Sequence, residues 1–167
     1  FFNLIGAQDL SLDLGELMDG KYDPKRLEAV RSMRNGEYYT VLEEDKTSNT
    51  NFLVSYAYSN TLERKVLIDS NRFPEKNKFS GYIFSNDEQK ILLETLTDNI
   101  YRRSKQAIYW IYDIKTNLLE KLFDQKVQEP LFSPDGSKVA YVYRRNLFIK
   151  NLDPVSYTHL TLPTNCV

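Results

Sequence analysis

Apolar and polar residues alternate along much of the chain between residues 38 and 150. The stretch NFLVSYAYS places Phe52, Val54, Tyr56 and Tyr58 on one face, with the period of two that predicts a β-strand. The segments RKVLIDS and QKILLET are compact apolar runs of strand length, and polar turn residues separate the runs. The pattern therefore predicts a succession of short strands joined by tight turns.

Two segments of the chain repeat each other about 50 residues apart. YIFSNDEQKILLE, residues 82–94, aligns with PLFSPDGSKVAYV, residues 130–142, so that Asp87 falls on Asp135. A looser third copy, SMRNGEYYTVL, has Asn35 at the same position. In SPDG the proline presets φ for a tight turn, and Asp-Gly supplies its tolerant positions. A period near 50 with several short strands per unit is typical of propeller blades.

These patterns predict an all-β fold, namely a partial β-propeller of about two to three antiparallel blades. A short helical turn is expected before it, in residues 13–19. Aromatic residues make up 13% of the chain, and such enrichment favours strands. We expect each blade to bury its faces against its neighbours. Trp110 and its neighbours Tyr109, Ile111 and Ile114 are accordingly predicted to be blade core rather than a ligand platform.

The composition excludes several classes of partner and site. Lys and Arg total 22 against 23 Asp and Glu, so no net field favours nucleic acid or an anionic membrane. A single cysteine excludes an internal disulfide framework and a multi-cysteine zinc site, and no metal or cofactor is expected. No apolar run approaches the roughly 20 residues that a membrane-spanning helix needs.

Three segments then point to a family. RSMRNGEYYTVL, DNIYRRSKQAIYWIYDI and LFSPDGSKVAYVYRRNLFIKNL resemble, in that order, the N-terminal propeller of the dipeptidyl peptidase IV family of prolyl oligopeptidase-type serine peptidases. The likeness is greatest to bacterial members typical of Bacteroidetes. It covers about residues 9–153, and residues 8–153 are predicted to be the N-terminal part of such a propeller.

The resemblance implies a serine exopeptidase that releases X-Pro or X-Ala dipeptides from peptide N-termini. In this family an eight-bladed propeller gates and anchors the substrate, and an α/β-hydrolase domain carries the catalytic Ser, Asp and His. The Gly-x-Ser-x-Gly elbow of that domain does not occur in this sequence. The parent protein is therefore expected to be the enzyme, while this fragment holds no catalytic residue and is expected to be inactive.

The resemblance also indicates one substrate-binding residue. YRRS matches the family's aromatic-Arg-x-Ser segment, which puts Arg102 at the position that binds a substrate carbonyl; Arg103 takes this role if the alignment shifts by one. Without the resemblance, both would be ordinary loop charges. The family's pair of glutamates for the substrate amino group should lie beyond residue 153. Glu43 and Glu44 come a whole blade too early and are expected to be a solvated pair in a loop.

For the parent, the expected partners are the peptide substrate, its own α/β-hydrolase domain and a second copy in a homodimer. An alternative from another class is a non-enzymatic propeller of the TolB type that acts as a binding module. The discriminating feature is downstream sequence, because a Tyr-Glu-Glu segment followed by a serine elbow would select the peptidase.

Both ends of the chain are unusual. Residues 1–7, FFNLIGA, are interpreted as the remnant of a secretory signal, which implies a periplasmic or secreted parent; a buried N-terminal strand is the alternative. Residues 154–167 are predicted to be non-native, because PVSYTHLTLPT resembles the translated transposon end and adapter of DNA sequencing libraries. The alternative is a genuine disordered C-terminus. His159 and Cys166 lie in this tail and are therefore not assigned to any site.

Overall fold

The computed structural model describes residues 13–22, 30–60, 62–74, 77–102 and 104–152. The predictions for residues 1–7, Arg103 and residues 154–167 lie outside these ranges. The described residues form a short helix, a 3-10 turn and eleven strands: α1 (Leu14–Met18), β1 (Arg31–Ser32), β2 (Tyr38–Asp45), β3 (Thr50–Ala57), β4 (Arg64–Asp69), η1 (Ser70–Arg72), β5 (Phe79–Phe84), β6 (Lys90–Asn99), β7 (Lys105–Asp113), β8 (Leu118–Lys121), β9 (Gln128–Phe132), β10 (Lys138–Tyr143) and β11 (Asn146–Asn151).

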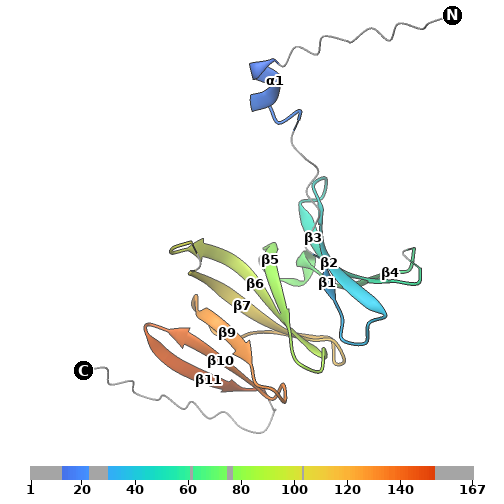
Figure 1. The fold of residues 1–167 in the computed structure, drawn as a ribbon. Helices are drawn as coiled ribbons and strands as arrows, with labels where there is room; N and C mark the ends of the chain where they lie inside the picture. The colour runs from blue at the N-terminus through green and yellow to red at the C-terminus, as the bar shows by residue number, and fades with distance from the viewer. Residues whose placement is uncertain (1–12, 23–29, 61, 75–76, 103, 153–167) are drawn as a thin grey trace, which may run out of the picture.

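The strands form three antiparallel sheets that follow one another along the chain (Figure 1). The first has the order β1-β2-β3-β4, the second β5-β6-β7-β8 and the third β9-β10-β11. Every pairing of these strands joins two that are consecutive in sequence, as in the blades of a propeller. Two four-stranded sheets and one three-stranded sheet confirm the prediction of a partial propeller with two to three blades.

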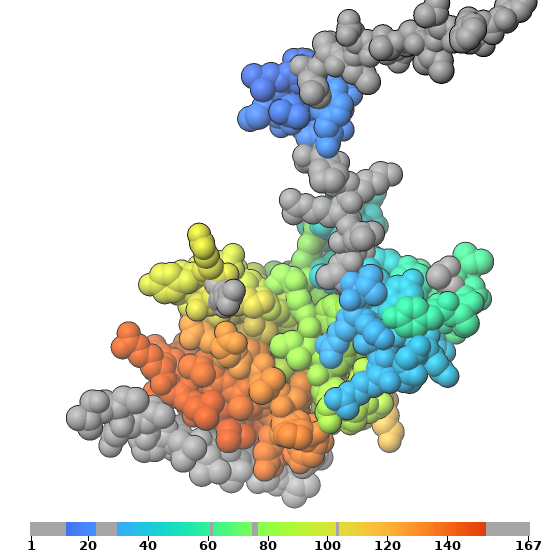
Figure 2. Space-filling model, viewed as in Figure 1, coloured from blue at the N-terminus to red at the C-terminus, as the bar shows by residue number. Residues whose placement is uncertain are grey.

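The predicted helical turn is present as α1. The side chain of Asp13 caps it by accepting a hydrogen bond from the Gly15 backbone N–H at 3.1 Å. The helix buries none of its residues, and Figure 2 shows it standing apart from the three sheets. None of the helices in the described ranges is both long and apolar enough to cross a lipid bilayer.

The repeated sequence segments form the same kind of turn in each of the three sheets. In the second sheet, Asp87 accepts hydrogen bonds from the Ser85 hydroxyl at 2.6 Å and from the Gln89 backbone N–H at 3.1 Å. Asp135 makes the same two bonds in the third sheet, at 2.5 and 3.1 Å. These bonds, the one from the serine hydroxyl above all, lower the pKa of the Asp135 carboxyl to about 2. In the first sheet, Asn35 accepts from the N–H two residues on at 3.1 Å.

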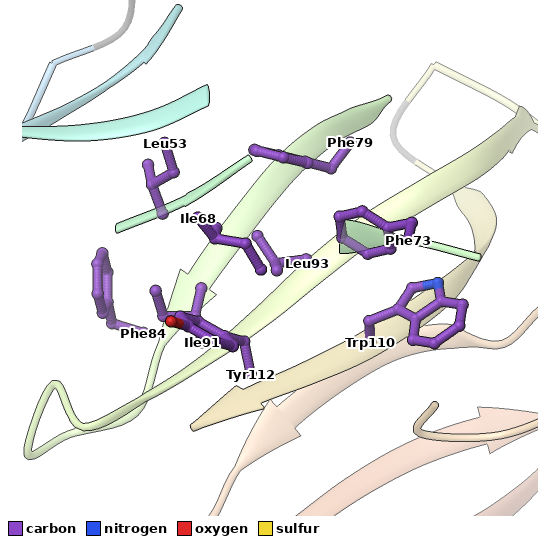
Figure 3. Close-up of a cluster of buried hydrophobic side chains, with 9 residues drawn as sticks. All are labelled: Leu53, Ile68, Phe73, Phe79, Phe84, Ile91, Leu93, Trp110 and Tyr112. Carbon is purple, nitrogen blue, oxygen red and sulfur yellow. The ribbon is translucent and has the colours of Figure 1, made fainter. Parts of the chain in front are cut away.

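The hydrophobic core lies between the sheets rather than within any of them. On β6, Ile91 and Leu93 point into a cluster shared with the first sheet, while Leu92 points into a cluster shared with the third. Figure 3 shows the first cluster, in which the Phe73 and Trp110 rings meet edge to face with centroids 5.4 Å apart. The second sheet is therefore buried on both faces, as the propeller pattern predicts.

The prediction that Trp110 and its neighbours belong to the core is confirmed. Trp110 lies in the cluster between the first two sheets, with Ile114 packed against its edge. Tyr109 and Ile111 point the other way, into the cluster between the second and third sheets. Successive residues of a strand face opposite sides, so β7 supplies side chains to both clusters.

Candidate substrate-contact site

The segment that contains Arg102 is the tip of a long hairpin. β6 and β7 are the longest strands of the second sheet, and they continue to pair as far as Asn99 and Lys105. β5 reaches only to a pairing with Thr95, so the last part of the hairpin extends beyond it as a two-stranded ribbon (Figure 1). A register shift between Thr95 and Asp98 marks the start of this ribbon.

The tip of the ribbon holds Arg102 in an exposed position. The Ser104 carbonyl accepts hydrogen bonds from the backbone N–H groups of Ile100 and Tyr101, at 2.8 and 3.1 Å, and so closes the turn. Arg102 is solvent-exposed, and none of the described residues forms an ion pair or hydrogen bond with its guanidinium. Its five N–H donors are therefore available to a ligand.

A buried carboxylate lies at the base of this ribbon. Glu94 of β6 is only 5% exposed. Its oxygens accept hydrogen bonds from the Lys105 ammonium at 2.5 Å, the Thr97 hydroxyl at 2.8 Å, and the hydroxyls of Ser80 and Tyr109, each at 3.3 Å. These donors come from β5, β6 and β7, so one side chain connects three strands at the point where the ribbon leaves the sheet.

The residues around Glu94 leave space for its carboxylate and donate hydrogen bonds to it. A Cβ at Gly81, the partner of Glu94 on β5, would lie 3.3 Å from a carboxylate oxygen, so glycine leaves the space that the carboxylate needs. Burial and the adjacent Glu94 charge both raise the pKa of Tyr109, which keeps its phenol protonated as a donor. Glu94 and Tyr109 line a cavity of about 200 Å³, and Glu129 and Pro130 of β9 line the same cavity.

The prediction that Glu43 and Glu44 form a solvated pair in a loop is wrong. Both residues lie in strand β2 rather than in a loop, and each has a cationic partner. Glu43 is bonded to Arg64 at 2.8 Å and to the Tyr56 hydroxyl, whereas Glu44 pairs with Lys78. Neighbouring residues of a strand point to opposite faces, so the two carboxylates cannot bind one ammonium group together.

The sequence pattern does not identify Glu94 as part of the site. The run QKILLET predicts only an apolar strand. The available signal is a carboxylate within a run that is otherwise buried, since such a residue almost always has a polar partner. Among the described residues, no three His, Cys, Asp or Glu side chains are grouped as they would be to bind a metal ion.

Three stacked antiparallel sheets with the same turn at one end define part of a β-propeller. Residues 85–162 match the family described as the dipeptidyl peptidase IV N-terminal region. This match overlaps residues 154–164, and the adapter origin of that stretch stays a prediction. A crystal structure of Porphyromonas gingivalis dipeptidyl peptidase 4 is 32% identical, with a TM-score of 0.78, over 94% of this chain and 22% of that one.

A curated relative named probable dipeptidyl-aminopeptidase B, from Neurospora crassa, is 30% identical over 74% of this chain and 13% of its own length. The structure of a putative TolB from Agrobacterium tumefaciens is 17% identical with a TM-score of 0.50, a likeness of fold alone. The chain is therefore part of the N-terminal propeller region of the dipeptidyl peptidase IV family. It spans a minor share of the relatives that it matches.

Proposed function

We propose that the protein containing this chain is a serine exopeptidase that releases X-Pro or X-Ala dipeptides from peptide N-termini. In this proposal the propeller gates and anchors the substrate, and Arg102 binds a substrate carbonyl. The observation that supports the role of Arg102 is its position, exposed and without an ion-pair partner among the described residues, at the tip of a ribbon fixed by Glu94. The relatives from Neurospora crassa and Porphyromonas gingivalis are named as a probable dipeptidyl-aminopeptidase B and a dipeptidyl peptidase 4, which supports this activity.

The chemistry of the site fits this assignment. A guanidinium keeps its charge at every working pH and presents donors in a rigid fork, so it can hold a carbonyl oxygen in a fixed place. The chain itself has no Gly-x-Ser-x-Gly elbow, and the proposal assigns the nucleophile to an α/β-hydrolase domain. The 167-residue chain alone is then inactive. A periplasmic or secreted location and a homodimeric state belong to the same proposal.

Replacing Arg102 by alanine in the full-length protein tests the proposed contact. Loss of a charge-assisted hydrogen bond should lower kcat/KM for a Gly-Pro reporter by about 1.5–3 kcal/mol, which is about one to two decades. Because Arg102 makes no bond to the described residues, the Tm of the variant should equal that of the wild type. Steady-state kinetics and a thermal melt of the same preparation check both parts.

Lys115→Gln is a suitable control, since Lys115 is an exposed cation at the other end of β7. It should leave both kcat/KM and Tm unaltered. Wild-type kinetics in Arg102→Ala would remove this residue from the site, and a fall in Tm would make it a structural arginine. A full-length protein that lacks a serine elbow and releases no dipeptide would instead be a binding module of the TolB type.

A further inference from the structure

A second pair of arginines lies at the tip of the next hairpin. β10 and β11 pair as far as Tyr143 and Asn146, so the turn between them consists of Arg144 and Arg145 alone. Both residues have positive φ, +47° and +66° respectively. A two-residue hairpin turn with this backbone favours Asn-Gly, because most L-residues are strained in the left-handed region. Arginine is therefore a costly choice at both positions.

Contacts within the hairpin do not explain this choice. The Asn146 side chain bonds the Arg144 carbonyl at 3.3 Å, which any residue at position 144 would allow. The Arg144 guanidinium lies over the Tyr143 ring at 5.2 Å, an exposed cation–π contact of modest strength. Backbone strain that local contacts do not explain is a feature of functional positions. A function of the two arginine side chains would explain why arginine occupies these strained positions.

These side chains line a pocket of about 380 Å³ between the second and third sheets. Its polar wall also contains a lysine and three glutamines, Lys126, Gln106, Gln125 and Gln128. The Lys126 charge is offset by Asp98 at 2.7 Å. Within the described ranges neither arginine has an ion-pair partner, so the pocket carries two uncompensated positive charges beside amide donors. Such a set of donors is suited to a carboxylate.

The pocket is close to the proposed substrate contact. Gln106, which lines it, follows Arg102 by four residues in the same hairpin. Four residues of chain span at most about 14 Å, which is also the reach of about four residues of an extended peptide. One bound peptide can therefore contact Arg102 and extend to this pocket.

We propose that this pocket, built on Arg144 and Arg145, binds the carboxylate of an acidic residue of the peptide substrate, a few positions downstream of the dipeptide that is released. The inference rests on the proposed peptidase function and adds a preference for acidic substrates to it. The charge of an aspartate or glutamate would meet two guanidinium groups, whereas the corresponding amide would meet only hydrogen-bond donors.

The test uses the full-length protein and matched peptides that begin with the same dipeptide. Members of a pair differ only in carrying Asp or Asn at one of the next four positions. The wild-type protein should cleave the Asp peptide with a kcat/KM roughly three- to tenfold higher at one of these positions, a range suited to partly exposed charge pairs. Replacing Arg144 and Arg145 together by Asn-Gly should abolish the preference while the Tm stays equal or rises, because Asn-Gly suits this turn.

Two further variants complete the design. Lys115→Gln combined with Lys138→Gln removes the same charge at the opposite ends of β7 and β10, and it should retain the preference. Arg145→Lys keeps a cation in the turn and should retain part of the preference for the Asp peptide. Equal cleavage of both peptides by an active wild-type protein would overturn the inference alone, as would an Asn-Gly variant that keeps the preference or loses stability. Failure to cleave either peptide would overturn the proposed function itself.

Discussion

One backbone position recurs in the three repeated turns, and it requires a left-handed conformation each time. Gly36, Glu88 and Gly136 occupy it with φ of +69°, +57° and +70°. Glycine adopts this region without steric cost, whereas a side chain in it is strained. Glu88 of the second turn contacts the first sheet, because its carboxylate accepts a hydrogen bond from the Arg34 backbone N–H at 3.0 Å.

Gly136→Ala should therefore destabilise the propeller through backbone strain. A Cβ there would lie 3.6 Å from an Asp87 carboxylate oxygen, an ordinary contact, so the expected loss of about 1–2 kcal/mol comes from φ alone. Chemical denaturation of the full-length protein measures it. Gly15→Ala, which makes the same change at a helical position without a positive φ, should cause no loss. Equal stability of the two variants would contradict this account of the turn.

At the scale of elements, the β6–β7 ribbon depends on Glu94. Glu94→Gln keeps the size of the side chain but removes the charge that Lys105, Thr97, Ser80 and Tyr109 all approach. It should lower the free energy of unfolding by about 1–3 kcal/mol, since buried donors lose a charged acceptor. Because the ribbon carries Arg102, KM of the full-length protein should rise as well. Thermal melts and kinetics measure the two effects.

Glu44→Gln is the matched control for this element. It makes the same substitution in an ion pair with a lysine, but Glu44 is half-exposed and lies in the first sheet. Exposed pairs contribute little to stability, so its Tm and KM should both remain near those of the wild type. If the two variants behaved alike, the ribbon would not depend on the buried carboxylate.

The sequence predicts strands and turns well and the site only in part. The repeated SPDG-like turns are local, so their residues are visible in the sequence, and Asn35, Asp87 and Asp135 do occupy one structural position. The network of Glu94 joins residues from three strands, and their register is not visible in the sequence. Likewise, the sequence shows that Arg144 and Arg145 are adjacent, but only the packing of two sheets reveals the pocket beside them.

At the scale of the whole molecule, the place of a sheet in the series decides whether one or both of its faces pack against another described sheet. The second sheet is covered on both sides, whereas each of the flanking sheets contributes one face to a described core cluster. On β9 the buried Phe132 faces the second sheet, so Leu131 points to the opposite side, where it is 65% exposed. A propeller sheet needs neighbours on both faces, and an exposed apolar face favours association.

The isolated 167-residue chain should therefore be poorly soluble and should self-associate. Open strand edges add to this tendency, because their unpaired N–H and C=O groups can pair with another chain. Light scattering coupled to size-exclusion chromatography should show large species whose amount rises with protein concentration.

Leu131→Gln should reduce the amount of these large species, because the change makes an unburied face more polar. Leu118→Gln, at a residue that is 59% exposed on the doubly covered second sheet, should have little effect. A monodisperse wild-type monomer that melts cooperatively would contradict the dependence of these sheets on further blades, since it would show that two interfaces between three sheets suffice for an independent fold.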